Sequence, residues 1–111
     1  MTRGEVWLAA LDPTRGSEQA GTRPVILFQS DSVIALLRTV VVIPLTTNLR
    51  WERFPFCLGL SKGEGGLASD SVALCHQVRV LDKSRLQQRL GKLSEDRMAR
   101  LEEAVAVALE M

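Results

Sequence analysis

The chain has 111 residues, 46% of them apolar and 24% charged, which is ordinary for a small globular protein. Its formal net charge is only +1, so any nucleic-acid binding must come from local clusters of its 14 Lys and Arg residues. No apolar run reaches the roughly 18 residues of a membrane span, and no signal-like segment opens the chain. We therefore expect one cytoplasmic domain over residues 1–111, with no membrane contact.

The two cysteines, Cys57 and Cys75, are too few and too far apart in sequence to indicate a zinc site. We expect reduced, structural thiols, no metal and no cofactor.

The first half of the chain predicts three strands. Residues 5–11 have apolar side chains on both faces, which is typical of a strand buried from two sides. Residues 25–28 form a second short strand, and the two should be antiparallel neighbours. Residues 39–45 are rich in β-branched side chains, and Pro44 removes a ladder donor, so pairing should stop near it. Residues 33–37 fit either a helical turn or an irregular apolar plug.

The second half begins with further strands. Residues 56–60 and 70–75 predict two strands joined by a connection, 61–69, that is rich in glycine and charge and reads as mobile. Residues 76–82 continue the sheet after a break. His76, the only histidine, could serve in acid-base chemistry, but a single histidine at a strand end is more often structural. We leave it out of the site.

Two helices are expected to close the chain. Asp82 or Ser84 can cap a short helix that ends at Gly91, with Leu86 and Leu90 four residues apart on one face.

The second helix should begin after Ser94, because Glu95 and Asp96 in its first turn favour the helix dipole. Val107 lies on its outer side. Its packing face consists of Met98, Leu101, Ala104, Val105, Ala108 and Leu109. Short strands followed by helices predict an α+β domain built on a small antiparallel, partly closed β-barrel.

The segment between the first two strands, Gly16 to Pro24, groups side chains suited to phosphate chemistry. It offers a hydroxyl, a carboxylate, an amide and a guanidinium, on Ser17, Glu18, Gln19 and Arg23. The guanidinium has five donors in a rigid fork that matches phosphate oxygens. The alternative is an ordinary polar turn with a weak surface ion pair.

A second polar cluster, Thr46, Thr47 and Asn48, follows the strand at 39–45. Paired hydroxyls and an amide in this position can be a turn cap without further function. They can also bind phosphate oxygens beside Arg23.

Residues 49–55 interleave two arginines with two aromatic side chains in a predicted loop. Such a mixture suits single-stranded RNA, whose bases stack on aromatic rings while its phosphates attract Arg50 and Arg53. Trp51 can either stack on a base or anchor the loop, whereas Phe54 is expected to pack.

These segments together resemble the MazF/PemK (Kid) family of toxin-antitoxin ribonucleases. The resemblance rests on Arg3-Gly4-Glu5-Val6-Trp7, then Asp12-Pro13, then Gly16 to Pro24, at fixed spacing over 22 positions. The later run Asp70-Ser71-Val72-Ala73-Leu74 also resembles that family, whose pattern does not call for a histidine at the position of His76.

The resemblance implies the fold that these toxins share with CcdB-type gyrase poisons, an SH3-like barrel with C-terminal helices, usually a homodimer. It also implies catalytic roles for Arg23 and for a threonine at the end of the strand, for which Thr46 aligns better than Thr47. A cognate antitoxin with an acidic tail over the RNA groove is the implied partner.

The implied activity is metal-independent cleavage of single-stranded mRNA, which inhibits translation and growth. The RNA 2′-hydroxyl would be the nucleophile, leaving a 2′,3′-cyclic phosphate and a 5′-hydroxyl. Arg23 would stabilise the transition state, Thr46 would bind a phosphate oxygen or the nucleophile, and Glu18 would act as base or orient Arg23. The expected RNA-binding residues are Ser17, Gln19, Thr47, Asn48, Arg50, Trp51 and Arg53.

Two other functions fit the same sequence. A CcdB-like protein would inhibit a protein target such as gyrase without catalysis, and fold alone does not separate it from a ribonuclease. A non-catalytic RNA-binding module would bind single strands in a salt-dependent way and leave them intact.

Overall fold

The computed structural model describes residues 1–11, 16 and 21–111, and it contains one antiparallel sheet of seven strands with two α-helices. The strands are β1 (Glu5–Ala10), β2 (Thr22–Leu27), β3 (Thr39–Thr46), β4 (Cys57–Leu60), β5 (Ser71–Leu74), β6 (Arg79–Asp82) and β7 (Leu86–Lys92). The α-helices are α1 (Asp31–Leu36) and α2 (Glu95–Leu109), and short 3-10 turns include η1 (Leu49–Arg53), η2 (Glu64–Gly66), η3 (Cys75–Gln77) and η4 (Lys83–Arg85).

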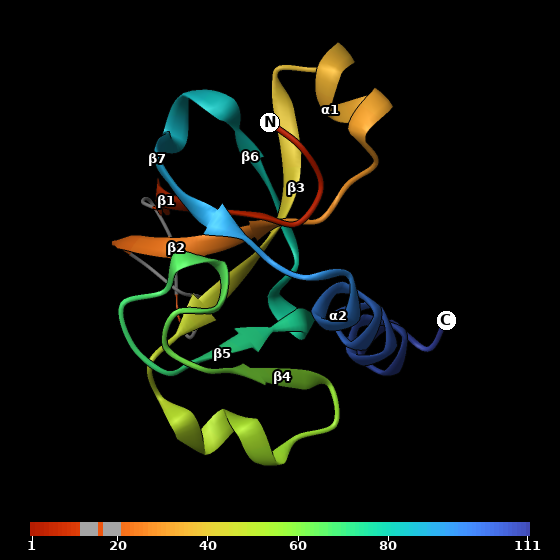
Figure 1. Cartoon of the computed structure of the whole chain (residues 1–111). Coiled ribbons are helices and arrows are strands. Elements are labelled where there is room, and N and C mark those ends of the chain that lie inside the picture. Colours follow the sequence, from red (N-terminus) through yellow and green to blue (C-terminus); the bar gives the residue numbers. More distant parts are fainter. Residues whose placement is uncertain (12–15, 17–20) are drawn as a thin grey trace.

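The strand order is β4-β5-β3-β2-β1-β7, and β6 also pairs with β3 (Figure 1). The sheet curls strongly, but its end strands β4 and β7 do not pair in the described part of the chain, so the barrel is open. The predicted α+β class and antiparallel sheet are confirmed.

The antiparallel pairing of the first two strands and the stop at Pro44 follow the prediction, and the structure adds that β2 also pairs with β3. β1 and β2 are antiparallel, with Ala9 opposite Arg23. The ladder between β2 and β3 runs from Leu27 to Val25 and stops at Pro44, which has no N–H to continue it. This register places the start of β2 beside the end of β3.

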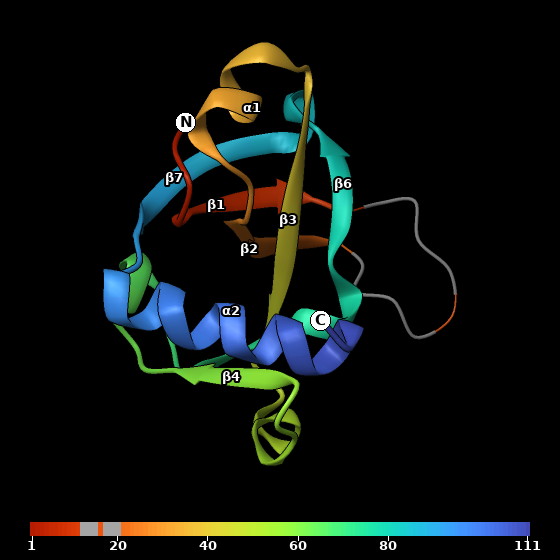
Figure 2. The same ribbon diagram turned by 90° about the vertical axis from the view of Figure 1, so that its right-hand side faces the viewer.

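The curled sheet has a hydrophobic cluster on each face. One cluster lies beneath α2 and includes Ile26, Ile43, Leu45, Leu101 and Val105. The other lies beneath α1 and β6 and includes Val25, Leu27, Ile34, Val42 and Leu81. Figure 2 shows α2 running across the curled sheet above β4. Successive residues of β2 and β3 therefore pack alternately into the hydrophobic clusters on the two faces of the sheet.

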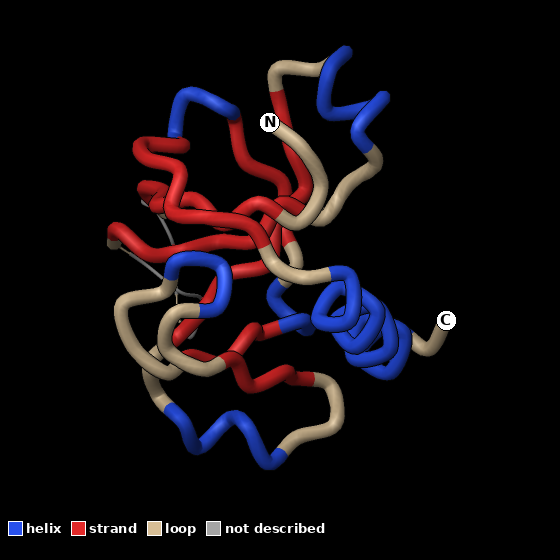
Figure 3. The backbone as a smooth tube through the Cα atoms, viewed as in Figure 1, coloured by secondary structure: helices blue, strands red, loops and turns tan. Residues whose placement is uncertain are grey.

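The predicted helix between Asp82 and Gly91 is wrong. Only the short turn η4 is helical, and residues 86–92 form β7, which pairs with β1 from Glu5↔Lys92 to Ala9↔Leu86 (Figure 3). A spacing of four residues, as between Leu86 and Leu90, places side chains on one face of a strand as well as of a helix. The pairing with β1 is what makes this segment a strand and not a helix.

The C-terminal helix α2 agrees with the prediction at its start. Ser94 is the N-cap, and its Oγ accepts a hydrogen bond from the Arg97 backbone N–H. Leu101 is buried and Val107 is exposed, as expected, but Leu109 is 49% exposed and does not join the core.

The structure defines the conformation of two segments that connect strands, residues 31–36 and the connection between β4 and β5. Residues 31–36 form α1, which settles the alternative of helical turn or irregular plug. The connection between β4 and β5, expected to be mobile, instead folds into η2 and packs on β7, with Gly65 and Leu67 buried. The two strands that it joins are antiparallel neighbours, so the predicted hairpin is confirmed, whereas the connection itself is folded and not a loose loop.

Candidate active site

Arg23 and Thr46 line the same small pocket, with a volume of about 70 Å³. Its other walls include Thr47, which directly follows β3, and Leu67, Ser69 and Ser71 from the β4–β5 connection and β5. We call this the candidate pocket. It brings together the two residues that the sequence nominated for catalysis.

The strand register explains why these two residues meet. Arg23 precedes Val25 by two positions, Thr46 follows Pro44 by two, and Val25 pairs with Pro44. In an antiparallel pair such positions share one face of the sheet. Thr46 also pairs with Val72 of β5, which brings β5 to the other side of the pocket.

Thr46 is held more firmly than its neighbour. It is only 8% exposed, and its Oγ1 accepts a hydrogen bond of 3.1 Å from the backbone N–H of Asn48. The Asn48 side chain in turn accepts a bond of 3.2 Å from the Arg50 backbone N–H and caps η1. Two successive side-chain turns therefore link the candidate pocket to the start of η1.

Thr47 is exposed but also lines the candidate pocket, so lining alone does not select the catalytic hydroxyl. Burial distinguishes the two, because a buried, hydrogen-bonded hydroxyl keeps a fixed position. The choice of Thr46 stays a prediction. Asn48 acts as a helix cap, which was the alternative considered for this cluster.

Three of the nominated residues, Ser17, Glu18 and Gln19, lie outside the described residues. Their predicted roles as base and RNA contacts stay predictions. Gly16 and Gly21 have φ values of +62° and +73°, as glycines in this segment were expected to allow.

The η1 turn presents Arg50 and Arg53 on the surface, where they line a pocket of about 440 Å³ with Leu49 and Glu52. The Arg53 guanidinium lies 4.7 Å from the centre of the Phe54 ring. Exposed guanidinium groups beside aromatic rings are suited to single-stranded nucleic acid.

Trp51 and Phe54 are both half-buried and pack against Cys57, Val72 and Leu74. The predicted packing role of Phe54 is confirmed. Trp51 also stacks on His76, with ring centroids 5.1 Å apart and planes inclined by 27°. Its ring therefore anchors the η1 turn whatever else it contacts.

His76 stands in this aromatic cluster and does not line the candidate pocket. Its ring is nearly perpendicular to that of Phe56, with centroids 5.0 Å apart and an interplanar angle of 81°. Partial burial lowers the pKa of His76 below its ordinary value, because it disfavours the charged ring. This arrangement agrees with the structural role expected from the sequence.

Glu5, within the Arg-Gly-Glu-Val-Trp motif, has a structural setting. It is 7% exposed, and its carboxylate accepts hydrogen bonds from Thr2 and from Trp7 Nε1, while Arg89 lies 3.4 Å away. Burial opposes ionisation, but the bonds from Trp7 and Thr2 outweigh it, and the pKa of Glu5 lies below its ordinary value. The motif therefore links β1 to β7.

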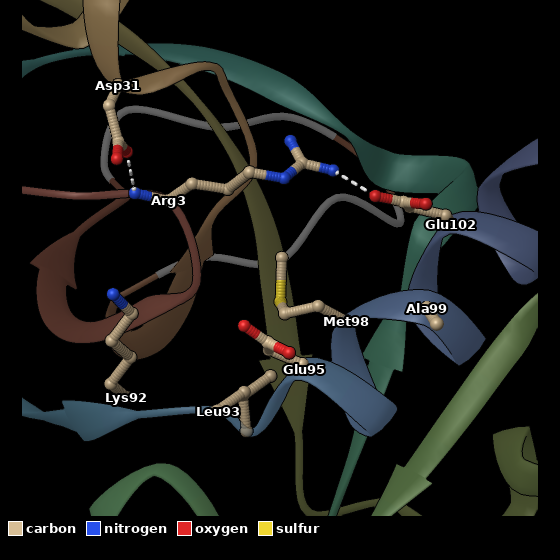
Figure 4. A pocket seen from close by; sticks show the side chains of 8 residues that line it. All are labelled: Arg3, Asp31, Lys92, Leu93, Glu95, Met98, Ala99 and Glu102. Carbon is tan, nitrogen blue, oxygen red and sulfur yellow. Dashed lines mark hydrogen bonds and ion pairs between the residues drawn. The ribbon is translucent and has the colours of Figure 1, made fainter.

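Another pocket, of about 380 Å³, lies where the N-terminal segment meets α2 (Figure 4). Arg3 Nη2 is 2.7 Å from Glu102 Oε1, and the Arg3 backbone N–H donates to Asp31 over 2.6 Å. Lys92 and Glu95 complete a wall of mixed charge. None of its lining residues belongs to the candidate pocket. Its Arg3–Glu102 ion pair ties the N-terminal segment to α2, and the hydrogen bond from the Arg3 backbone to Asp31 ties it to α1.

The sequence did not nominate the pocket walls supplied by Leu67, Ser69 and Ser71. Ser71 lies in the family-like run at 70–74, but nothing local places these residues at the pocket, which they reach through the pairing of β3 with β5. Within the described ranges, no group of three or more His, Cys, Asp or Glu residues has an arrangement that could hold a metal ion.

Cys57 and Cys75 are free and buried, and burial raises the pKa of the Cys75 thiol to about 12. No helix in the described part of the chain is long and apolar enough to cross a membrane.

Comparison with known proteins identifies the family. Residues 2–109 match the family model of PemK-like, MazF-like toxins of type II toxin-antitoxin systems. The chain is 38% identical to endoribonuclease MazF of Staphylococcus saprophyticus over 109 residues, which are 98% of this chain and 91% of that protein.

Solved structures share the fold. MazF from Deinococcus radiodurans superposes with a TM-score of 0.85 at 23% identity, covering 100% of this chain and 97% of that one. An endoribonuclease from a mycobacterial species, solved with its cognate antitoxin, gives a TM-score of 0.83 at 22% identity, covering 100% and 96%. With nearly its whole length matched, the chain belongs to the PemK-like, MazF-like toxin family of type II toxin-antitoxin systems.

Proposed function

We propose that this toxin is an endoribonuclease that cleaves single-stranded RNA at the candidate pocket. The observation that carries the proposal is the convergence of Arg23 and Thr46 on one pocket at the ends of two adjacent strands. The name of the staphylococcal relative, endoribonuclease MazF, supports the same activity.

In the proposed reaction the RNA 2′-oxygen forms a bond to phosphorus and the bond from phosphorus to the 5′-oxygen breaks. The 2′ proton passes to a base, for which Glu18 is the candidate, and the leaving oxygen gains a proton. Arg23 donates to the phosphate oxygens, on which charge develops, and Thr46 donates its hydroxyl hydrogen to one of them. The products carry a 2′,3′-cyclic phosphate and a 5′-hydroxyl.

Cleavage of cytoplasmic mRNA would make this toxin an inhibitor of translation and growth. We also propose a homodimer and a cognate antitoxin whose acidic segment covers the basic groups Arg23, Arg50 and Arg53. Relatives solved with their cognate antitoxins support such a partner. Light scattering of the isolated toxin tests the dimer.

The experiment is to incubate the purified protein with a long mixed-sequence RNA in the presence of EDTA, beside Arg23→Ala. We expect fragments from the wild type alone, with cyclic phosphate and 5′-hydroxyl ends. RNA that is bound but left intact by a folded protein would contradict catalysis and favour a binding module. RNA that is neither bound nor cut would point to a protein target, to be sought by affinity capture.

A further inference from the structure

A second pocket lies directly beside the candidate pocket and shares Ser71 with it. Its volume is about 300 Å³, at the lower end of the range for small-molecule sites. Its walls include Gly59 of β4, Asp70 and Glu52, together with Arg97 of α2. We call it the adjacent pocket.

The charges along this surface alternate. Arg23 lines the candidate pocket, Glu52 and Asp70 line the adjacent pocket, and Glu52 then borders the pocket that contains Arg50 and Arg53. Guanidinium groups attract phosphates, whereas carboxylates repel phosphates and accept hydrogen bonds from base N–H groups. A strand of RNA therefore fits with phosphates at the two ends and one base between them.

Glu52 is the acceptor left available in the adjacent pocket. Asp70 Oδ1 accepts a bond of 2.9 Å from the Lys62 backbone, and Arg97 Nε donates to Glu64 over 2.8 Å. No hydrogen bond or ion pair holds the Glu52 carboxylate within the described part of the chain.

The floor of the pocket fits that carboxylate closely. A Cβ added to Gly59 would lie 1.8 Å from Glu52 Oε2, so only glycine leaves room for the carboxylate where it lies. The position of Glu52 therefore depends on the absence of a side chain on β4.

We propose that the adjacent pocket binds a guanine base within two nucleotides of the cleaved bond, with Glu52 accepting from guanine N1–H and the N2 amino group. Guanine alone offers two neighbouring donors that match the two oxygens of a carboxylate. Adenine and cytosine set an acceptor beside their amino group, and uracil flanks its single N–H with two acceptors. The assignment rests on the proposed ribonuclease function.

The test maps cleavage of RNA oligonucleotides randomised around the cut, using wild type, Glu52→Gln and, as a matched control on the exposed face of α2, Glu103→Gln. Wild type and Glu103→Gln should require guanine at one position. Glu52→Gln should lose about tenfold to a hundredfold of that preference, because an amide cannot accept both bonds. Gly59→Ala should do the same without changing any charge.

Inosine in place of that guanine removes only the N2 amino group. It should slow the wild type about tenfold and leave Glu52→Gln unchanged, as for two groups that interact directly. Cleavage by the wild type without a guanine requirement, or a requirement kept by Glu52→Gln, would overturn the assignment while leaving the ribonuclease function intact. A wild type that cuts no RNA would overturn both.

Discussion

The carbonyl oxygen of Leu90 in β7 occupies the space that a side chain on Gly66 would need. A Cβ built on Gly66 would lie 2.0 Å from that oxygen, and Gly66 also has a φ of +76°. The η2 turn therefore rests directly on the backbone of β7. From this position it carries the chain on to Leu67, Ser69 and Ser71, which wall the candidate pocket.

Gly66→Ala should destabilise the protein more than Gly63→Ala. Gly63 also has a positive φ, +95°, but nothing lies within 4 Å of its added Cβ. Gly63→Ala should therefore cost only about 1–2 kcal/mol of conformational strain, whereas Gly66→Ala adds about 1–3 kcal/mol of overpacking. Urea unfolding followed by tryptophan fluorescence measures both. Equal losses would show that the backbone contact is not tight.

Arg23→Ala should lower single-turnover cleavage by about 10²–10³-fold, as for loss of one transition-state donor. Arg23→Lys should also be poor, because an ammonium group cannot reproduce the two-pronged contact with phosphate. Arg100→Ala, on the exposed surface of α2, is the matched control and should cut normally. Near-normal rates for Arg23→Lys would mean that only charge is needed there.

Thr46→Val should reduce cleavage more than Thr47→Val, because the buried Thr46 hydroxyl has the fixed position. Thr46→Val also removes the acceptor for the Asn48 N–H, so its unfolding free energy must be measured alongside. Thr46→Ser keeps the hydroxyl and should restore most of the activity. The reverse order of the two valine variants would assign the role to Thr47.

Glu5→Gln should destabilise the fold at pH 7 by about 1.5–3 kcal/mol, the usual contribution of hydrogen bonds to a charged group. The folded-state pKa of Glu5 is lowered, so its contribution is present above the unfolded value of about 4.3 and is lost as the pH falls through the folded value. The stability gap between wild type and variant should therefore shrink below about pH 4. A gap that is constant with pH would mean that Glu5 charge is not involved.

Arg50→Ala should weaken the salt dependence of RNA binding. In an Arg23→Ala background that leaves RNA uncut, removing one phosphate contact should reduce the slope of log K against log salt by about 0.7. Binding isotherms of a labelled single strand at several salt concentrations give this slope. An unchanged slope, as expected for the control Arg100→Ala, would place Arg50 outside the RNA path.

The sequence by itself determined the elements whose signals are local. The strands around Trp7 and Val41, the helix after Ser94 and the stop at Pro44 follow from side-chain patterns within a few residues. The proximity of Arg23 and Thr46 could also be predicted from the sequence, because pairing of consecutive antiparallel strands brings the start of one strand beside the end of the next. The family motif in the same segments pointed to the same pair.

Only the tertiary structure decided what depends on distant partners. Residues 86–92 are a strand because β1, some 80 positions earlier, pairs with them, while their own spacing fits a helix equally well. Leu109 remains exposed because α2 extends beyond the core that its pattern predicted it would cover. The adjacent pocket brings together Glu52 of η1, Gly59 of β4 and Ser71 of β5, and it shares Ser71 with the candidate pocket. Such contacts leave no local pattern, since the chain forms them only when the sheet curls.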